Sequence, residues 1–188
     1  MTDKKHICPA WLAGFLDNWF RKWLQNPRKI LGPYIKSGMS VLDFGCGPGF
    51  FTVEIAKMVG TSGKVIAVDV QEGMLQKLKD KIIGTDINNR IILHKSIENR
   101  IGIVDPVDVV VAFYVFHELT NKNDILYEIK GLLKENGLFI LIEPKYVHVS
   151  KQEFNDTVSK ANNIGLKEIG SINMLMSRSV VMKNCVQK

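Results

Sequence analysis

The sequence of 188 residues is long enough for one domain with a substantial core, and its 46% hydrophobic and 23% charged residues exclude a largely disordered chain. The net charge of +6 leaves nucleic acid open as a partner without favouring it, and the most apolar stretch, Val107 to Phe116, is too short to span a bilayer. Three widely separated cysteines and a polar, charged start predict a cytoplasmic protein with neither a disulfide framework nor a secretory signal.

The first part of the chain, residues 9–36, shows helical periodicity. Asn26-Pro27 is expected to end a first helix and to start a short second one, which stops near Gly32-Pro33. We therefore assign residues 1–37 to an N-terminal helical cap and residues 38–188 to the main domain, both within one compact unit.

Short apolar strands alternate with amphipathic helices in the main domain. The predicted strands are 39–44, 64–70, 91–94, 107–113, 138–143, 166–171 and 178–183. The predicted helices are 51–59, 72–83, 123–133 and 150–164. This alternation predicts a doubly wound α/β fold with a seven-stranded, mostly parallel sheet whose last two strands pair antiparallel. Ligands of such sheets bind at the carboxyl ends of the strands, near the point where the strand order reverses.

Three closely spaced glycines, Gly45, Gly47 and Gly49, join the first predicted strand to the next helix. They let a ligand approach the backbone, but such a turn alone fits either a phosphate-binding loop or a merely tight turn. Asp43, just before the glycines, would repel a pyrophosphate and suits the ammonium group of an amino-acid ligand. The Gly-x-Gly-x-Gly spacing also differs from the Gly-x-Gly-x-x-Gly of a dinucleotide fold, which disfavours NAD.

Asp69 closes the second predicted strand. An acidic residue at this place accepts hydrogen bonds from ribose hydroxyls, which indicates a nucleoside ligand without specifying one. The structural alternative is an N-cap for the helix that follows Val70. The two roles are compatible.

Two segments, Val41-Leu-Asp-Phe-Gly-Cys-Gly-Pro-Gly-Phe50 and Val65-Ile-Ala-Val-Asp69, resemble the first two motifs of class I S-adenosylmethionine-dependent methyltransferases. The similarity in layout covers residues 30–183, and the sequence is most like the small-molecule branch that includes ubiquinone/menaquinone-type enzymes. The resemblance implies a Rossmann-like methyltransferase fold with S-adenosylmethionine as cofactor. It further implies that Asp43 and the three glycines contact the methionine part, with Cys46 as a small residue beside it, and that Asp69 binds the ribose.

The adenine site follows from the same resemblance. Val70 and Met74 are expected to flank the adenine ring. Many relatives carry an Asp after the third strand that binds the adenine amino group, whereas this sequence has Ser96, followed by Ile97. Ser96, Ile97 or backbone groups are therefore expected to supply this contact.

The fourth predicted strand ends in Ala112-Phe-Tyr-Val-Phe-His117-Glu118, at the edge expected to face the transferred methyl group. Tyr114 and His117 are the candidate acceptor contacts and catalytic residues, with His117 the preferred base because histidine serves most often near neutral pH. The alternative is that His117 and Glu118 cap or pack the following helix. The segment lacks the Asn/Asp-Pro-Pro-Tyr/Phe turn of enzymes that methylate exocyclic amines of bases, which argues against that reaction.

Two further groups of residues give weaker signals. Three polar residues follow Glu143-Pro144 and are candidates for the acceptor pocket: Lys145, Tyr146 and His148. A strand stop followed by a surface loop is the favoured interpretation of that segment. His6 and Cys8 form a His-x-Cys pair, but a structural zinc site needs four well-spaced ligands, so no metal is expected.

Aromatic side chains at helical spacing, Trp11, Phe15 and Trp19, mark the N-terminal helix. The favoured interpretation is that this helix packs its apolar face against the core. In a second interpretation, these side chains cover the acceptor pocket, as N-terminal segments do in the resembling family. They would then select an apolar or aromatic acceptor. A third interpretation, docking on a membrane surface, would make the same face unavailable to the core; it draws on Arg21, Lys22, Arg28 and Lys29.

The resemblance thus implies an enzyme that methylates a small molecule. The alternatives are an RNA or protein methyltransferase, suggested by the basic balance, and a non-catalytic S-adenosylmethionine-binding module. Lysines such as Lys77, Lys79 and Lys81 lie scattered along predicted helices, as on solvated helix faces rather than in a groove for nucleic acid. The sequence leaves a homodimer open.

Overall fold

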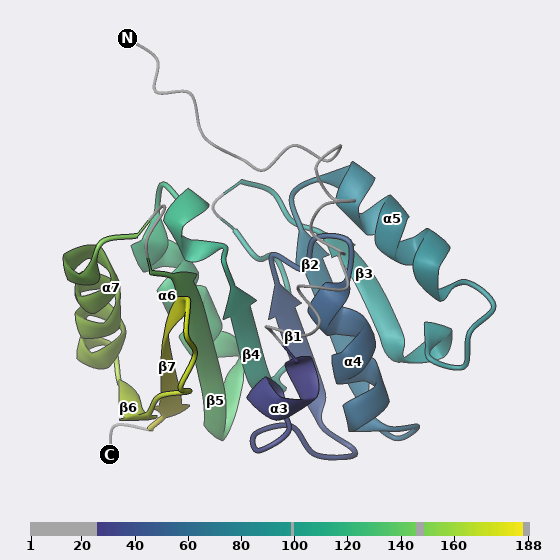
Figure 1. Ribbon diagram of the computed structural model, residues 1–188, viewed down its shortest axis with the longest axis horizontal. Helices are drawn as coiled ribbons and strands as arrows, with labels where there is room; N and C mark the ends of the chain where they lie inside the picture. Colours follow the sequence, from purple (N-terminus) through teal and green to yellow (C-terminus); the bar gives the residue numbers. More distant parts are fainter. Residues whose placement is uncertain (1–25, 99, 146–148, 186–188) are drawn as a thin grey trace, which may run out of the picture.

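Seven strands form one sheet in the order β3-β2-β1-β4-β5-β7-β6 (Figure 1). The computed structural model describes residues 26–98, 100–145 and 149–185, so the helix expected from Pro9 lies outside the described residues. The strands are β1 Ser40–Phe44, β2 Lys64–Asp69, β3 Ile91–Lys95, β4 Val107–Phe113, β5 Leu133–Pro144, β6 Leu166–Gly170 and β7 Ser177–Asn184. The first five strands pair in parallel, and β7 pairs antiparallel with both β5 and β6. The predicted doubly wound, mostly parallel sheet is confirmed.

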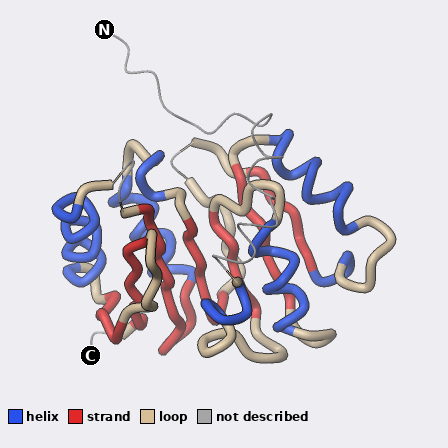
Figure 2. The backbone as a smooth tube through the Cα atoms, viewed as in Figure 1, coloured by secondary structure: helices blue, strands red, loops and turns tan. Residues whose placement is uncertain are grey.

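Helices cover both faces of the sheet (Figure 2). They are α3 Pro27–Leu31, α4 Phe50–Val59, α5 Glu72–Ile82, α6 Lys122–Leu132 and α7 Lys151–Asn163, with short 3-10 turns η2 Asn88–Arg90 and η3 Phe116–Glu118. Buried residues of α3, α4 and α5 form one core cluster with one face of the strands, and those of α6 and α7 form a second cluster with the other face. No helix in the described part of the chain is both long and apolar enough to cross a membrane.

Alternation along each strand produces these two cores. Val41 on β1 packs into the α4–α5 cluster, whereas its neighbour Leu42 packs into the α6–α7 cluster. The side chains of successive strand residues point to opposite faces, so a strand buried on both sides must be apolar throughout. All five residues of β1 are buried, including Ser40 and Asp43. A charged residue inside such a strand therefore calls for a specific explanation.

The short helix α3 begins where the sequence predicts it. The Asn26 side chain accepts hydrogen bonds from the backbone N–H groups of Arg28 and Lys29, and Pro27 occupies the first turn. This is the usual chemistry of a helix start, because an N-cap oxygen satisfies amides that have no partner inside the helix. Ile30 and Leu31 are buried in the α4–α5 core.

Predicted and observed boundaries of the strands and of the helices α4 to α7 differ by at most one residue, except at the start of β5. The sequence predicts a strand from Leu138, but β5 begins at Leu133, which pairs with Val107. Residues 134–136 are polar and exposed, so the apolar pattern that predicts a strand does not extend over them. The side-chain amide of Asn184, on β7, donates to the Leu133 carbonyl and helps to hold this early part of β5.

Gly49 closes the loop between β1 and α4 at a left-handed φ of 82°, and a Cβ there would lie 2.3 Å from Leu78 Cδ1 on α5. We predict that Gly49→Ala lowers the free energy of unfolding by about 2–4 kcal/mol, through backbone strain and overlap with the fully buried Leu78. Gly84→Ala is the matched control, because Gly84 also has a left-handed φ, of 74°, but its built Cβ has no atom of the described chain within 4 Å. Its expected loss is about 1 kcal/mol. Equal losses in urea denaturation of the two variants would contradict the packing argument.

Candidate active site

The loop after β1 and the segment after β4 meet at the carboxyl edge of the sheet. A Cβ built on Gly45 would lie 2.6 Å from Val115 Cγ2, so only glycine permits this approach. The backbone N–H groups of Gly45 and Cys46 both donate to the Val68 carbonyl of β2, at 2.8 and 3.0 Å. The strand order reverses between β1 and β4, which places this contact at the switch point where ligands of doubly wound sheets bind.

Asp43 is buried at the end of β1, with 2% of its surface exposed. One carboxylate oxygen accepts a hydrogen bond of 2.6 Å from the Thr52 hydroxyl on α4. Burial raises the pKa of Asp43 to about 6, the Thr52 hydrogen bond opposes that rise, and the charge of Asp69 adds to it. An acid that is hard to ionise in the folded chain would gain from a cation placed beside it.

Asp69 lies at the end of β2, next to the glycine loop. Its two carboxylate oxygens accept hydrogen bonds of 2.9 Å from the backbone N–H groups of Gly47 and Gln71. Burial raises the pKa of Asp69, while hydrogen bonds from the amides of Gln71, Gly47 and Val70 hold it down. The N-cap of α5 is Gln71, not Asp69, so the capping alternative is not what the structure shows.

Cys46 and Gly47 form the middle of the loop. Cys46 is buried, and burial raises the pKa of its thiol well above its usual range, with the charges of Asp43 and Asp69 adding to the rise. It is a neutral, packed side chain, in keeping with the small residue expected there. Gly47 has a left-handed φ of 53°, and no atom of the described residues lies within 4 Å of its built Cβ, so the described part of the structure leaves the loop open at this position.

The residues expected around adenine lie after β2, in α5 and after β3. Met74 is buried on α5, Val70 is 41% exposed, and Ile97 is 65% exposed. Ser96 follows β3, and its backbone N–H donates to the Asp69 carbonyl. The buried Ser96 hydroxyl has no hydrogen-bond partner among the described residues, which is uncommon for a buried polar atom and fits a ligand as its partner.

Tyr114 has a left-handed φ of 57° directly after β4. Such a backbone is unusual for a bulky side chain and marks functional positions more often than others. Its ring packs on Phe113, with centroids 4.3 Å apart, and its hydroxyl lies 2.5 Å from Ser177 Oγ at the start of β7. Ser177 was not expected from the sequence, because only the antiparallel pairing of β7 with β5 brings residue 177 to this edge.

His117 lies in η3, and its ring Nδ1 is 2.9 Å from Glu143 Oε2. Glu143, on β5, also accepts hydrogen bonds of 3.1 Å from the backbone N–H groups of Phe116 and His117. The favoured interpretation of Glu143-Pro144 as a simple strand stop therefore misses a buried partner of His117. The N-cap of α6 is Asn121, so neither His117 nor Glu118 caps that helix.

Other candidates fall outside this arrangement. Trp11, Phe15, Trp19, Tyr146 and His148, and the His6–Cys8 pair, lie outside the described residues. Lys145 is described, and its ammonium group donates to the carbonyls of Met174 and Leu175. Among the described residues, no group of three or more His, Cys, Asp or Glu side chains is arranged to hold a metal ion.

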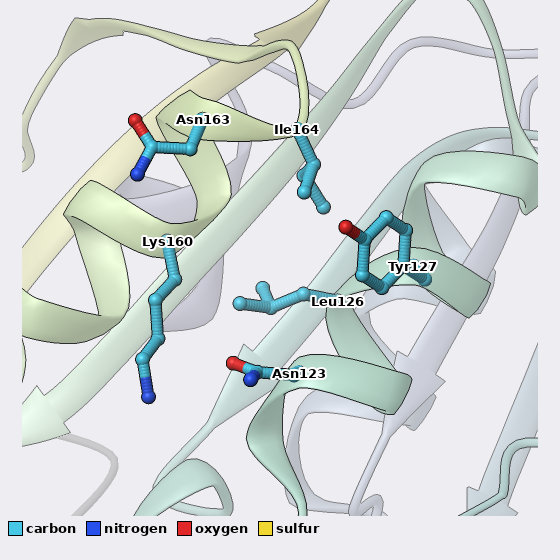
Figure 3. A pocket seen from close by; sticks show the side chains of 6 residues that line it. All are labelled: Asn123, Leu126, Tyr127, Lys160, Asn163 and Ile164. Atoms are coloured by element: carbon cyan, nitrogen blue, oxygen red, sulfur yellow. The ribbon is translucent and has the colours of Figure 1, made fainter.

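A separate pocket lies between α6 and α7 (Figure 3). Asn123, Leu126 and Tyr127 line it from α6, and Lys160, Asn163 and Ile164 line it from α7 and its end. None of these six residues belongs to the glycine loop or to the strand ends around it. The pocket and the candidate active site are therefore different places on the molecule.

Comparison with known proteins identifies the family. Residues 35–185 match the family described as a methyltransferase domain, and the chain therefore belongs to that family. The demethylmenaquinone methyltransferase of Lactobacillus johnsonii is 28% identical over 131 residues, covering 69% of this chain and 51% of the relative. The ribosomal protein L11 methyltransferase of Dictyoglomus thermophilum is 33% identical over 112 residues, covering 60% of this chain and 35% of the relative. The chain thus spans about half the length of the first of these relatives and about a third of the second.

A solved structure gives the same assignment over the whole fold. The crystal structure of a SAM dependent methyltransferase from Aquifex aeolicus superposes with a TM-score of 0.83 and 28% identity, covering 95% of this chain and 100% of that chain. The resemblance drawn from the glycine loop and Asp69, and the Rossmann-like methyltransferase fold that it implied, are confirmed.

The raised pKa of Asp43 predicts a pH-dependent effect of Asp43→Asn on stability. Because the folded pKa of about 6 lies above the ordinary 3.8, ionised Asp43 destabilises the fold above pH 6, and protonation removes this cost as the pH falls. Asparagine keeps an acceptor for Thr52, so we expect the variant to be more stable than the wild type by about 3 kcal/mol at pH 8 and by less than about 1 kcal/mol at pH 4. Urea denaturation at both pH values measures the difference.

Asp80→Asn is the control for this experiment, since Asp80 is exposed on α5. Its expected effect is within about 0.5 kcal/mol at either pH. If the wild type is more stable than Asp43→Asn at pH 8, the conclusion that burial of the ionised Asp43 carboxylate destabilises the fold is wrong.

Proposed function

We propose that the chain binds S-adenosylmethionine at the carboxyl edge of β1 and β2 and transfers its methyl group to a small-molecule acceptor. The observation that carries the proposal is the pair of buried carboxylates, Asp43 and Asp69, on either side of a glycine loop that is open at Gly47. Membership of the methyltransferase domain family and the likeness to the Aquifex aeolicus protein support it. The relative named for demethylmenaquinone supports a small, apolar or aromatic acceptor.

The residues present fit each part of this cofactor. Asp43 would hold the ammonium group of the methionine part, and the charge of that group would favour the ionised form of a carboxylate that burial disfavours. Each Asp69 oxygen accepts one backbone N–H, and a carboxylate oxygen has room for a further donor, such as a ribose hydroxyl. Ser96 offers to the adenine edge a buried hydroxyl that has no partner in the described part of the chain.

The acceptor side of the site is formed after β4. S-adenosylmethionine supplies an activated methyl group, so the chain's own task is to position the acceptor, exclude water and accept a proton where the acceptor carries one. We assign acceptor contacts to Tyr114 and His117, with His117 as the base. Residues 1–37 form the cap in this proposal, and Trp11, Phe15 and Trp19 within it contribute to acceptor binding.

A protein or RNA acceptor is the second candidate. The relative named for ribosomal protein L11 favours it, because its identity of 33% is above that of the quinone-type relative. The described basic side chains of α5 argue against it, since Lys77, Lys79 and Lys81 lie on a helix with interspersed acidic residues instead of a continuous basic groove.

Transfer of labelled methyl from S-adenosylmethionine into a cell extract distinguishes the acceptors. The full chain is incubated with extract, and the products are separated by size with and without ribonuclease. We expect label in the small-molecule fraction. Label in ribonuclease-sensitive or protein material would replace the small-molecule acceptor by the second candidate, and absence of transfer despite cofactor binding would favour a non-catalytic module.

Gly47→Ala tests the cofactor site itself. A methyl group at this position would meet no atom of the described residues but would project into the space assigned to the cofactor. We expect S-adenosylhomocysteine affinity, measured by calorimetry, to fall at least about tenfold. Gly84→Ala is the control, because it shares the left-handed φ and the open Cβ direction but lies away from the loop. Both variants should lose about 1 kcal/mol of stability, so equal affinities would show that Gly47 does not border the cofactor.

A further inference from the structure

We propose that Glu143 is a positioning residue that holds His117 as a general base, and that the acceptor carries a proton on the attacking atom, as a phenol or enol hydroxyl does. This inference rests on the proposed methyl transfer. It goes beyond the proposed function because it assigns a role to Glu143 and names the chemical class of the acceptor.

The Glu143 carboxylate is buried and receives three hydrogen bonds. It is 2% exposed, and three N–H groups point at its carboxylate, from the backbone of Phe116, the backbone of His117 and the His117 ring. An ionised carboxylate is an acceptor only and can receive all three, whereas a neutral amide of the same shape would set a donor against one of them. The three bonds join the end of β5 to η3, so they fix both the backbone and the ring of His117.

The Glu143 contact selects one form of the imidazole. With Nδ1–H donated to Glu143 Oε2 at 2.9 Å, the neutral ring carries its lone pair on Nε2. Proton exchange with an acceptor then falls to Nε2, which lies 4.0 Å from Glu118 Oε1. A carboxylate that orients a histidine also stabilises the imidazolium formed when the ring accepts a proton.

The acidic groups around the His117 ring favour its protonated form. Burial by itself lowers the pKa of His117, but the hydrogen bond and charge of Glu143 and the charge of Glu118 raise it above its usual value. Lys122 on α6 opposes this rise, and its ammonium group is paired with Glu153 on α7 at 2.6 Å. The described charged groups that act on the ring thus come from η3, β5 and α6, and the acidic ones prevail.

The dyad lies next to the glycine loop. His117 is two residues after Val115, which fills the space left open by Gly45. Phe116, between them, packs its ring edge-on against Phe44 of β1, with centroids 6.4 Å apart. The backbone that carries His117 is therefore fixed against the same strand end that carries Asp43.

A base is useful only to an acceptor that carries a proton when it attacks. In the transfer, an electron pair of the acceptor oxygen forms the new bond to the methyl carbon, and the methyl–sulfur bond breaks with its electrons remaining on sulfur. The hydroxyl proton passes to His117 Nε2 and leaves to solvent in a later step. A phenol or enol hydroxyl is mostly protonated at neutral pH, so it gains from this base, whereas an acceptor without a proton would not.

NMR of the ¹⁵N-labelled full chain tests the dyad without cofactor or acceptor. The sequence has four histidines, and the spectrum of His117→Gln assigns the signals of His117. We expect the neutral ring to carry its proton on Nδ1 and to titrate above the ordinary 6.5. A neutral ring protonated on Nε2 would overturn the proposal, as would titration below 6.5. Since no ligand is needed, this result is independent of whether methyl transfer is found.

The methyl-transfer rates of two variants test whether the orientation of the His117 ring matters for the reaction. Glu143→Gln is compared with Glu118→Gln, which removes the same charge from a carboxylate 4.0 Å from the ring. In the labelled-methyl assay with extract, we expect Glu143→Gln to lower the maximal rate about 10–100-fold. Its acid limb should also move to lower pH, while the affinity for S-adenosylhomocysteine is kept. Glu118→Gln should lower the rate less than about threefold and preserve the Nδ1–H form.

The pH profile separates positioning from mere structural support. If Glu143 only stabilised the fold, Glu143→Gln would lower the rate by the same factor at every pH, with loss of cofactor affinity in proportion to unfolded chain. An unshifted acid limb in a folded Glu143→Gln variant would refute the positioning role.

Discussion

The close approach of Gly45 to Val115 is the constraint on which the rest of the site depends. The 2.6 Å between a built Cβ and the valine methyl leaves no room for any side chain at position 45. Because the approach is so close, the loop after β1 and the segment after β4 form one continuous surface. On one side of it lie Asp43 and Asp69, and on the other lie Tyr114 and His117. A methyl donor and an acceptor bound on the two sides would meet at this contact.

Three acidic residues occupy the ends of three parallel strands, and the structure compensates each differently. Asp43 of β1 receives a hydroxyl group, Asp69 of β2 receives backbone amides, and Glu143 of β5 receives amides and an imidazole. The compensation is weakest at Asp43, where burial raises the pKa to about 6. That is the place where the proposed function puts a cationic ligand group, so the destabilised charge and the expected ligand correspond.

The sequence predicts most of the fold because local signals agree with tertiary structure. Strands buried on both faces must be continuous apolar runs, and the glycines and Asn26-Pro27 mark real turns and helix starts. The start of β5 is not predicted, because Lys134, Glu135 and Asn136 are polar. Pairing with Val107 and the hydrogen bond from Asn184, both far away in sequence, hold this part of the strand.

The site is predictable to a similar extent. The loop residues and Asp69 follow from spacing, and Tyr114 and His117 follow from their place after β4. Glu143 and Ser177 do not, because each becomes relevant only through a partner from another strand: His117 in one case, Tyr114 in the other. A side chain whose importance comes from long-range pairing has no periodicity or motif to mark it. An acidic residue directly after an apolar run is the one local signal, and Glu143 carries it after residues 138–142.

The position of β7 between β5 and β6 also makes the candidate site depend on the last part of the described chain. In the described sheet β6 pairs with β7 alone, and β7 joins this hairpin to β5. Ser177 lies at the start of β7 and contacts the Tyr114 hydroxyl. A chain that lacked the β6–β7 hairpin would keep the residues of the glycine loop but lose the Tyr114–Ser177 contact.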